Sequence, residues 1–153
     1  MAAGSGPEKL SDFEGRWHIT RRIEDAKAGG TGGPGLFEGV AVFTKDDAGL
    51  TYDEAGELRL PDMAGHRGGI NATRRYFWRD GDGAIDVLFD DGRDFHRIDL
   101  GATVATAWHD CPPDWYEVSY NFTRWPDWRV IWRVRGPRKD YTMVSDYRRK
   151  VGR

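Results

Sequence analysis

The sequence predicts an all-β protein, a single up-and-down antiparallel β-barrel of about eight to ten strands. Apolar and polar residues alternate with a period of two through most of the chain, as they do in strands with one buried face. Clusters of Gly, Pro and Asp, which are typical of turns, interrupt the alternation about every dozen residues. Apolar residues at helical spacing are almost absent. These patterns favour a sheet built from consecutive hairpins.

Strands are predicted in eleven segments, near 14–25, 36–45, 49–54, 57–60, 69–79, 84–90, 93–100, 103–111, 114–124, 128–136 and 139–149. After the first of them, residues 27–35 hold five Gly and one Pro, a composition that predicts a flexible loop or lid. The length suits one domain with a sizeable core. We therefore expect a single domain over 1–153, with 1–10 as a flexible N-terminal tail.

The charge balance limits the classes of partner. A net charge of −2 argues against a nucleic-acid-binding protein. Residues 124–153 nevertheless carry 10 Lys and Arg against 3 Asp and Glu, so the last hairpin has a basic surface. That surface is either a solvated face whose charges are compensated locally, or a docking site of a protein-interaction module for an acidic partner.

We expect a cytoplasmic protein with no membrane partner. No apolar run approaches the roughly 20 residues needed to cross a bilayer, and residues 1–10 lack the basic start and apolar stretch of a signal peptide. The single cysteine, Cys111, excludes an internal disulfide and is typical of a reducing compartment.

Turn positions predict which residues face the barrel interior, because each turn fixes the pairing of its two strands. Taking Asp91-Gly92 as a two-residue turn predicts the pairs Ile85 with Ile98, Val87 with His96, and Phe89 with Asp94. The loop 80–83 adds Trp78 with Ile85, Tyr76 with Val87, and Arg74 with Phe89. The turn Gly101-Ala102 adds Ile98 with Ala105, His96 with Ala107, and Asp94 with His109. The turn Pro112-Pro113 adds Ala105 with Tyr120, Ala107 with Val118, and His109 with Tyr116. All these pairs are assigned to the inner face, and an odd loop length at 125–127 adds Trp128, Val130, Trp132 and Val134.

Earlier in the chain, a turn at Asp46-Asp47 predicts four further inward pairs, which are Phe43 with Leu50, Ala41 with Tyr52, Gly39 with Glu54, and Phe37 with Gly56. Glu54 is then either an inward carboxylate that contacts a ligand or a residue at a hairpin tip over 53–58. On the first strand, Arg21 shares the inner face with Trp17.

Several motifs carry a resemblance to known barrels. Gly15-Arg16-Trp17 on the first strand resembles the Gly-X-Trp motif of the lipocalin and fatty-acid-binding-protein barrels. The resemblance implies that Trp17 closes the barrel floor, and that Arg148 or Arg149 packs across it. Over the whole chain the sequence resembles a bacterial lipocalin-like (calycin-type) family catalogued as a domain of unknown function. The residues that carry this second resemblance are Phe37, Gly39, Arg74, Tyr76, Trp78, 91–96, His109, Cys111 and 136–141. It implies the fold and no activity.

The predicted interior holds ionisable groups at one end. Arg74, Asp94, His109 and Tyr116 are expected at one level of the lumen. Buried charges cost several kcal/mol unless they are paired, solvated or bound to a ligand. The level is therefore either a self-satisfied network or a site for a small anionic or amphipathic ligand. In the second case the binding residues are Arg74, Tyr76, Asp94, His96, His109, Tyr116, Arg21, Tyr52 and Glu54.

Five alternatives remain open at this point. An isomerase, dehydratase or hydrolase could use Asp94, His109 and Tyr116 as acid–base groups, with Asp94 orienting His109. No cofactor is predicted, although His96, His109 and Cys111 could chelate a metal, and one inward histidine could hold haem. The basic C-terminal hairpin could instead bind a protein, and exposed sheet edges could pair in a homodimer.

Overall fold

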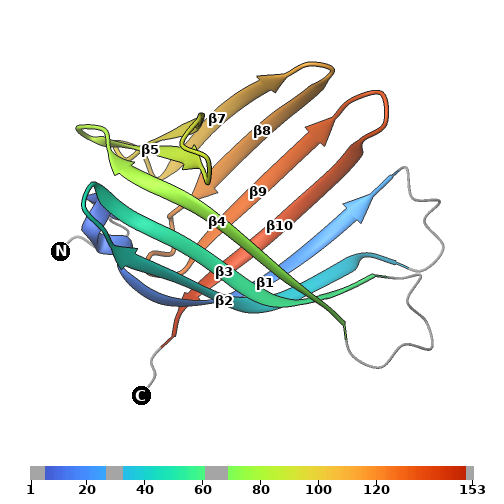
Figure 1. The fold of residues 1–153 in the computed structure, drawn as a ribbon, viewed down its shortest axis with the longest axis horizontal. Helices are drawn as coiled ribbons and strands as arrows, with labels where there is room; N and C mark the ends of the chain where they lie inside the picture. The colour runs from blue at the N-terminus through green and yellow to red at the C-terminus, as the bar shows by residue number, and fades with distance from the viewer. Residues whose placement is uncertain (1–5, 27–32, 61–68, 151–153) are drawn as a thin grey trace.

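The structure, a computed structural model, describes residues 6–26, 33–60 and 69–150. In the described part of the chain one short 3₁₀ helix, η1 (Leu10–Phe13), precedes ten strands. The strands are β1 (Gly15–Asp25), β2 (Gly35–Lys45), β3 (Gly49–Arg59), β4 (Ile70–Asp80), β5 (Ala84–Phe89), β6 (Asp94–Asp99), β7 (Val104–Cys111), β8 (Asp114–Asn121), β9 (Trp128–Arg135) and β10 (Asp140–Arg149). They form one antiparallel sheet, which curls into a nearly closed barrel (Figure 1). The predicted fold class is confirmed.

The first and last strands pair with each other, so the margins of the sheet lie in the middle of the sequence. The strand order is β6-β5-β4-β3-β2-β1-β10-β9-β8-β7. No hydrogen-bonded ladder joins β6 to β7 among the described residues, and we call the line where these two strands face each other the seam. Side chains close it, since the His109 ring lies 5.3 Å from Phe95 and 5.6 Å from Phe89. The sheet edges that were expected to be free to pair with a second copy of the chain, β6 and β7, therefore face each other across the seam.

A hairpin between β6 and β7 was predicted, and that pairing is wrong. The linking residues form their hydrogen bonds elsewhere: Leu100 N donates to Gly83 O at 3.1 Å, and Phe122 N donates to Thr103 O at 2.7 Å. The connection is thereby held by the loops before β5 and after β8, and the two strands do not share a ladder.

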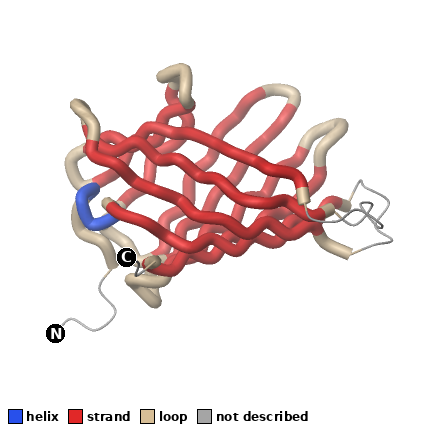
Figure 2. Tube along the Cα trace, turned by 60° about the horizontal axis from the view of Figure 1, so that its bottom comes forward, coloured by secondary structure: helices blue, strands red, loops and turns tan. Residues whose placement is uncertain are grey.

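η1 lies at one end of the strands (Figure 2), and an aromatic cluster around its Phe13 forms the floor of the barrel. Phe13 is fully buried at the end of η1. Five rings surround it at centroid distances of 5.1 to 5.9 Å, those of Phe43, Trp78, Phe122, Trp125 and Trp128. Each fully buried ring contributes roughly 1.5–3 kcal/mol through apolar burial. The floor is therefore a main source of stability.

Trp17 and Arg149 complete the floor as the resemblance implied. Trp17 is fully buried, and its Nε1–H donates to Phe13 O at 2.8 Å. The Arg149 guanidinium lies 3.9 Å from the centre of the Trp17 ring and donates to Glu14 O and Asp12 O at 2.7 and 2.8 Å. Arg149, not Arg148, is thus the packing arginine. η1 itself was not predicted from the sequence.

The inward faces of β7, β8 and β9 agree with the prediction. The pairs His109 with Tyr116, Ala107 with Val118, and Ala105 with Tyr120 are those predicted. On β9 the residues Trp128, Val130 and Val134 are buried and Trp132 is half-buried, whereas Arg129 and Arg135 are exposed.

Two other hairpins have the predicted faces with a register shifted by two residues. Tyr52 pairs with Phe43 instead of Ala41, and Tyr76 pairs with Phe89 instead of Val87. A shift of two leaves every side chain on its predicted face. The first shift arises because Asp46 closes a longer turn, with its side chain accepting from Ala48 N at 2.9 Å and from Thr51 Oγ1 at 2.6 Å.

The prediction that Asp94 points into the lumen is wrong. Pairing between β5 and β6 follows the prediction for Ile85 and Val87, but the next pair is Leu88 with Asp94, which leaves Phe95 as an extra residue. Such a β-bulge changes the face of the residues beyond it. Phe95 is buried and Asp94 is exposed.

Residues 49–59 form one continuous strand, so the predicted hairpin tip over 53–58 and the separate strands 49–54 and 57–60 are wrong. Most of the loop predicted at 27–35 lies outside the described residues. Of the expected N-terminal tail the structure describes residues 6–10, where Pro7 is buried. Within the described ranges, no helix is long and apolar enough to cross a membrane.

Candidate ligand-binding site in the barrel lumen

A narrow cavity lies in the lumen above the aromatic floor. Its volume is about 40 Å³, which is room for about three water molecules. It is lined by Arg21, Tyr52, Glu54, Arg74, Tyr76, Trp78, Val87, Phe95, His96, Tyr120, Trp128, Val130, Trp132, Met143, Ser145 and Tyr147. Pockets for drug-sized ligands have roughly 300–1,000 Å³. The lumen in this form therefore admits an end group of a ligand and not a whole one.

One wall of the cavity holds a buried ion pair between β1 and β3. Arg21 donates to the two Glu54 carboxylate oxygens at 2.7 and 2.9 Å and to Ser145 Oγ at 2.7 Å. The side chains of Arg21 and Glu54 are only 13% and 5% exposed. Burial alone would raise the pKa of Glu54, but the hydrogen bonds and positive charge of Arg21 outweigh it and hold that pKa below its ordinary value. The pair is therefore ionised and internally neutral.

Two tyrosines extend this network toward β10. Tyr52 donates to Glu54 Oε1 at 2.5 Å, and the hydroxyls of Tyr52 and Tyr147 are 2.8 Å apart. Burial raises the pKa of Tyr52 well above its ordinary value and that of Tyr147 to about 12. Both hydroxyls stay protonated at neutral pH, so the network is complete without a ligand.

The mouth, the end of the lumen away from η1, carries a cation without a carboxylate partner. It is formed by Arg74, Tyr76, Phe89, His109 and Tyr116, all at least partly exposed. Arg74 donates to Tyr76 Oη at 3.1 Å. Among the residues that the structure describes, no carboxylate lies within ion-pair distance of Arg74, because Glu54 on the neighbouring strand is bound to Arg21. The mouth therefore has one cation without a direct ion-pair partner beside the cavity, and it shares the charge of Glu54, its neighbour across the strands, with Arg21.

His96 points into the lumen, as predicted, and is neutral there. Its Nε2 lies 2.8 Å from Tyr120 Oη across the seam. Burial, with a smaller effect from His109, lowers the pKa of His96 to about 3. Burial likewise raises the pKa of Tyr120 well above its ordinary value. The pair is thus an uncharged hydrogen bond between β6 and β8.

The predicted acid–base set is not assembled. His109 and Tyr116 face each other at the mouth, with ring centroids 6.0 Å apart. Tyr116 Oη accepts from Lys139 Nζ at 3.2 Å. Asp94 is exposed on β6, on the face opposite to the lumen. Within the part of the chain that the structure describes, no carboxylate is hydrogen-bonded to His109.

The two cofactor alternatives find no preformed site among the described residues, and both stay untested predictions. Cys111 is exposed, and within the described residues no group of three or more His, Cys, Asp or Glu side chains could hold a metal ion. His96, the inward histidine considered for haem, borders a cavity of about 40 Å³, far below the roughly 300–1,000 Å³ of ordinary ligand pockets.

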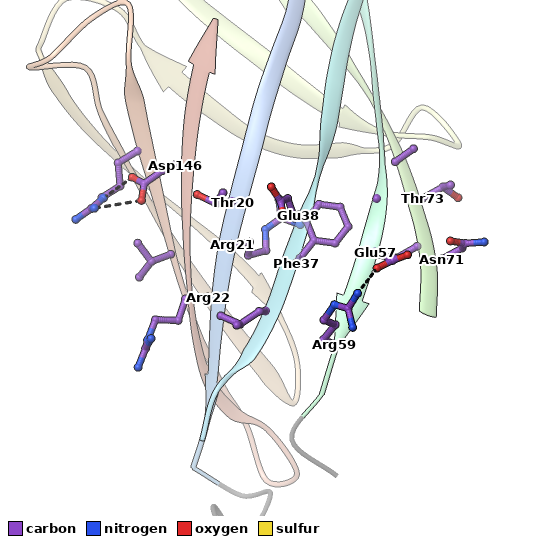
Figure 3. A pocket seen from close by; sticks show the side chains of 16 residues that line it. Thr20, Arg21, Arg22, Phe37, Glu38, Glu57, Arg59, Asn71, Thr73 and Asp146 are labelled. Atoms are coloured by element: carbon purple, nitrogen blue, oxygen red, sulfur yellow. Dashed lines mark hydrogen bonds and ion pairs between the residues drawn. The ribbon is translucent and has the colours of Figure 1, made fainter. Parts of the chain in front are cut away.

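A larger depression of about 1310 Å³ lies on the outer face of the sheet, over β9, β10, β1, β2, β3 and β4 (Figure 3). Two ion pairs lie within it: Arg129 donates to Asp146 at 2.7 Å and Arg59 to Glu57 at 2.9 Å. Two other lining residues, Arg22 and Glu38, lie within ion-pair distance of Glu24 and His18 outside the lining. Small side chains such as Ala55 and Thr73 line it. The depression is wide, open and electrostatically compensated, so we favour the small lumen cavity as the site.

The basic last hairpin is also partly compensated. Arg129 pairs with Asp146, Arg133 with Asp140, and Lys139 with Asp114, at 2.7 to 3.0 Å. A protein-docking role for this hairpin stays a prediction.

Sequence reasoning missed three features of the site. The buried indole nitrogens Trp78 Nε1 and Trp128 Nε1 have no partner in the described structure, nor does His96 Nδ1. Both tryptophans had been assigned only to the apolar core. Alternation with Asp94 and His96 on the inner face predicts Phe95 on the outer face of the barrel. A bulky residue so close to the Asp91-Gly92 turn could have indicated a β-bulge. Tyr147 and Ser145 fell on the last strand, whose inward face had not been assigned.

Comparisons with known proteins agree with this fold. Residues 13–149 match the model of a family described as "Family of unknown function (DUF6314)". The chain belongs to this family. No curated protein matches the sequence.

Among solved structures, the chain is similar to the S-type phycobiliprotein lyase CPES from Guillardia theta. The two share 10% sequence identity with a TM-score of 0.57, and the match covers 94% of this chain and 92% of the other. This likeness extends over the whole barrel and concerns the fold. The family and the neighbour together identify a lipocalin-like barrel.

Proposed function

We propose that this protein binds a small anionic, amphipathic molecule at the mouth of the barrel. Arg74 is the observation that carries the proposal. It is a guanidinium beside the lumen cavity whose neighbouring carboxylate is already bound to Arg21. A guanidinium presents two parallel N–H donors to a carboxylate or sulfonate and binds it more strongly than it binds water.

Aromatic rings next to Arg74 supply an apolar surface for the rest of the ligand. The Phe95 ring stacks on Phe89 at 4.2 Å and on Trp132 at 5.1 Å, and Tyr76 lies 5.5 Å from it. Because the cavity has only about 40 Å³, most of an amphipathic ligand would lie against these rings at the mouth. The similar phycobiliprotein lyase supports the barrel as a ligand-handling fold and says nothing of which ligand is bound here.

The test uses two fluorescent probes that differ by one charge. Anilinonaphthalene sulfonate is an anion, and N-phenylnaphthylamine has the same aromatic skeleton without the sulfonate. We expect the wild-type protein to bind the anion at least tenfold more tightly, and the variant Arg74→Gln to lose that preference, since one charge-assisted pair contributes about 1.5–3 kcal/mol.

Arg75→Gln is the matched control. Arg75 is the next residue on β4, points to the outer face and donates to Asp53 at 2.6 Å. This variant has the same change in net charge and should keep the preference. Equal binding of both probes by the wild type, or equal losses in the two variants, would refute a role of Arg74 as the anion site.

A further inference from the structure

Three buried nitrogens in the lumen lack a hydrogen-bond partner. They are Trp78 Nε1, Trp128 Nε1 and His96 Nδ1, for which the described residues provide no partner. All three residues line the same cavity. A buried polar atom left without a partner costs about 1–3 kcal/mol, and native proteins hold few of them. Three on one cavity of about 40 Å³ indicate a group that binds there.

The cluster offers hydrogen-bond donors. An indole nitrogen can only donate. In the His96 and Tyr120 pair, either Tyr120 donates to Nε2 and Nδ1 carries the proton, or Nε2 donates and the Tyr120 hydroxyl hydrogen is free. Either tautomer therefore leaves one further donor, so three groups that line one cavity each have an unused donor in the described structure.

The acceptor that suits these donors is uncharged. The charge of Arg21, a cation on the cavity wall, is paired with Glu54, and His96 is neutral. An anion placed at the tryptophans would lack a counter-charge and would face the Glu54 carboxylate, at a cost of several kcal/mol. A carbonyl oxygen needs only donors and carries no charge.

We propose that Trp78, Trp128 and the His96–Tyr120 pair form an inner subsite for a neutral acceptor oxygen, such as the carbonyl of a ketone or an amide. The inference rests on the proposed function, because the same ligand places its anionic group at Arg74. The two subsites are separated along β4, where Arg74 and Trp78 are four residues and thus roughly 13 Å apart between Cα atoms. An end group of about three non-hydrogen atoms fits the cavity volume.

A pair of matched acids tests the subsite. One is a pentanoate that ends in a 4-acetylphenyl group, and the other ends in a 4-ethylphenyl group of nearly the same shape, so that only the carbonyl differs. Isothermal titration of the full chain is expected to give at least tenfold tighter binding of the acetyl probe. Trp78→Phe and Trp128→Phe should each reduce this ratio at least fivefold, with little change for the ethyl probe.

Trp125→Phe is the control, because Trp125 packs in the floor against Phe13 and does not line the cavity. It should keep the ratio. The ¹⁵N-edited spectrum of the indole groups gives a readout independent of affinity: the Trp78 and Trp128 Nε1–H signals should move downfield with the acetyl probe only. This measurement also decides the case in which a phenylalanine variant fails to fold.

The outcomes separate the two proposals. If neither acid binds, both the anion site and the inner subsite are refuted. If both acids bind equally, depend on Arg74, and leave the indole signals unmoved, the inner subsite is refuted and the anion site stands. Exchange of the indole signals with ordered water that neither probe displaces would identify the cavity as a water site only, and would also overturn the subsite.

Discussion

The tryptophans of this barrel fall into two groups that differ in how their indole nitrogens are bonded. At the floor, Trp17 has its indole nitrogen bonded to a backbone carbonyl, and Arg149 covers its ring while binding two further carbonyls. On the lumen side of the same floor, Trp78 and Trp128 are also buried, yet their indole nitrogens have no partner in the described structure. A satisfied cluster stabilises a fold, whereas an unsatisfied one at a cavity is a cost that a ligand can offset. The difference teaches that burial alone does not separate core from site.

The largest expected effect is at the floor. Trp17→Ala should lower the free energy of unfolding by about 3–5 kcal/mol, because it leaves a cavity among rings that cannot collapse. Urea unfolding followed by circular dichroism measures it. The control is Trp108→Ala, at a tryptophan that is 58% exposed on β7, with an expected change within about 0.5 kcal/mol. Equal effects at the two sites would contradict the assignment of the floor as the stability centre.

The buried ion pair should come next. Glu54→Leu leaves Arg21 charged and buried without its carboxylate, which should cost about 3 kcal/mol. The double variant Arg21→Met with Glu54→Leu should recover most of this loss, since an apolar pair needs no partner. Urea unfolding of the two variants and the wild type tests the coupling. If the double variant is no more stable than Glu54→Leu, the ion pair is not the cause.

A smaller effect concerns pH. The ordinary pKa of histidine is about 6.5, and burial lowers that of His96 to about 3. As pH falls below 6.5, the unfolded chain takes up a proton at this residue and the folded chain does not. The contribution of neutral His96 to stability is therefore complete above pH 6.5 and is lost as the pH falls toward 3. Between pH 6.5 and 5 the free energy of unfolding falls by about 1.5 kcal/mol.

His96→Phe should remove this part of the pH dependence, as measured by urea unfolding at several pH values. His18→Gln, a change at a histidine of β1 that lies near Glu38 outside the lumen, should keep it. An unchanged slope in His96→Phe would show that other groups cause the decline. Glu54, whose pKa is lowered, acts only below its ordinary range near about 4.3, so the two contributions can be separated.

The smallest effect is expected for the arginine over the floor. Arg149→Met removes the contact with the Trp17 ring and two hydrogen bonds to carbonyls, and should cost about 1 kcal/mol. Arg148→Met is the neighbouring control, because Arg148 is exposed. Thermal unfolding is sensitive enough to compare them. A larger loss for Arg148→Met would exchange the roles of the two residues.

Much of the inner face could be predicted because strand parity tolerates register errors of two residues. The β4–β5 and β2–β3 hairpins are both shifted in this way, and Tyr76, Trp78 and Glu54 still point inward. Asp94 could not be placed, because a single-residue bulge at Phe95 changes the face and its position depends on packing between strands. The seam was missed for a related reason: a short connection normally predicts a hairpin, and the hydrogen bonds of Leu100 and Thr103 decide otherwise.

The candidate site was predicted only in outline. The inward Arg21, Arg74 and His96 follow from alternation, but which cation keeps a free charge depends on side-chain geometry that the sequence does not contain. The bidentate pairing of Arg21 with Glu54 decides it. The unpartnered indole nitrogens could not be predicted either, because the sequence does not show whether the nitrogen of a tryptophan donates to a carbonyl.

The seam affects how a ligand can enter such a narrow lumen. In a fully closed barrel, a continuous ring of main-chain hydrogen bonds fixes the circumference. Here the main-chain hydrogen bonds are interrupted between β6 and β7. Contacts between aromatic side chains and the His96–Tyr120 hydrogen bond hold the wall together there. Widening the barrel at the seam breaks side-chain contacts but no main-chain hydrogen bonds between strands. The β5–β6 hairpin is therefore the part of the wall that can move at the lowest cost in free energy.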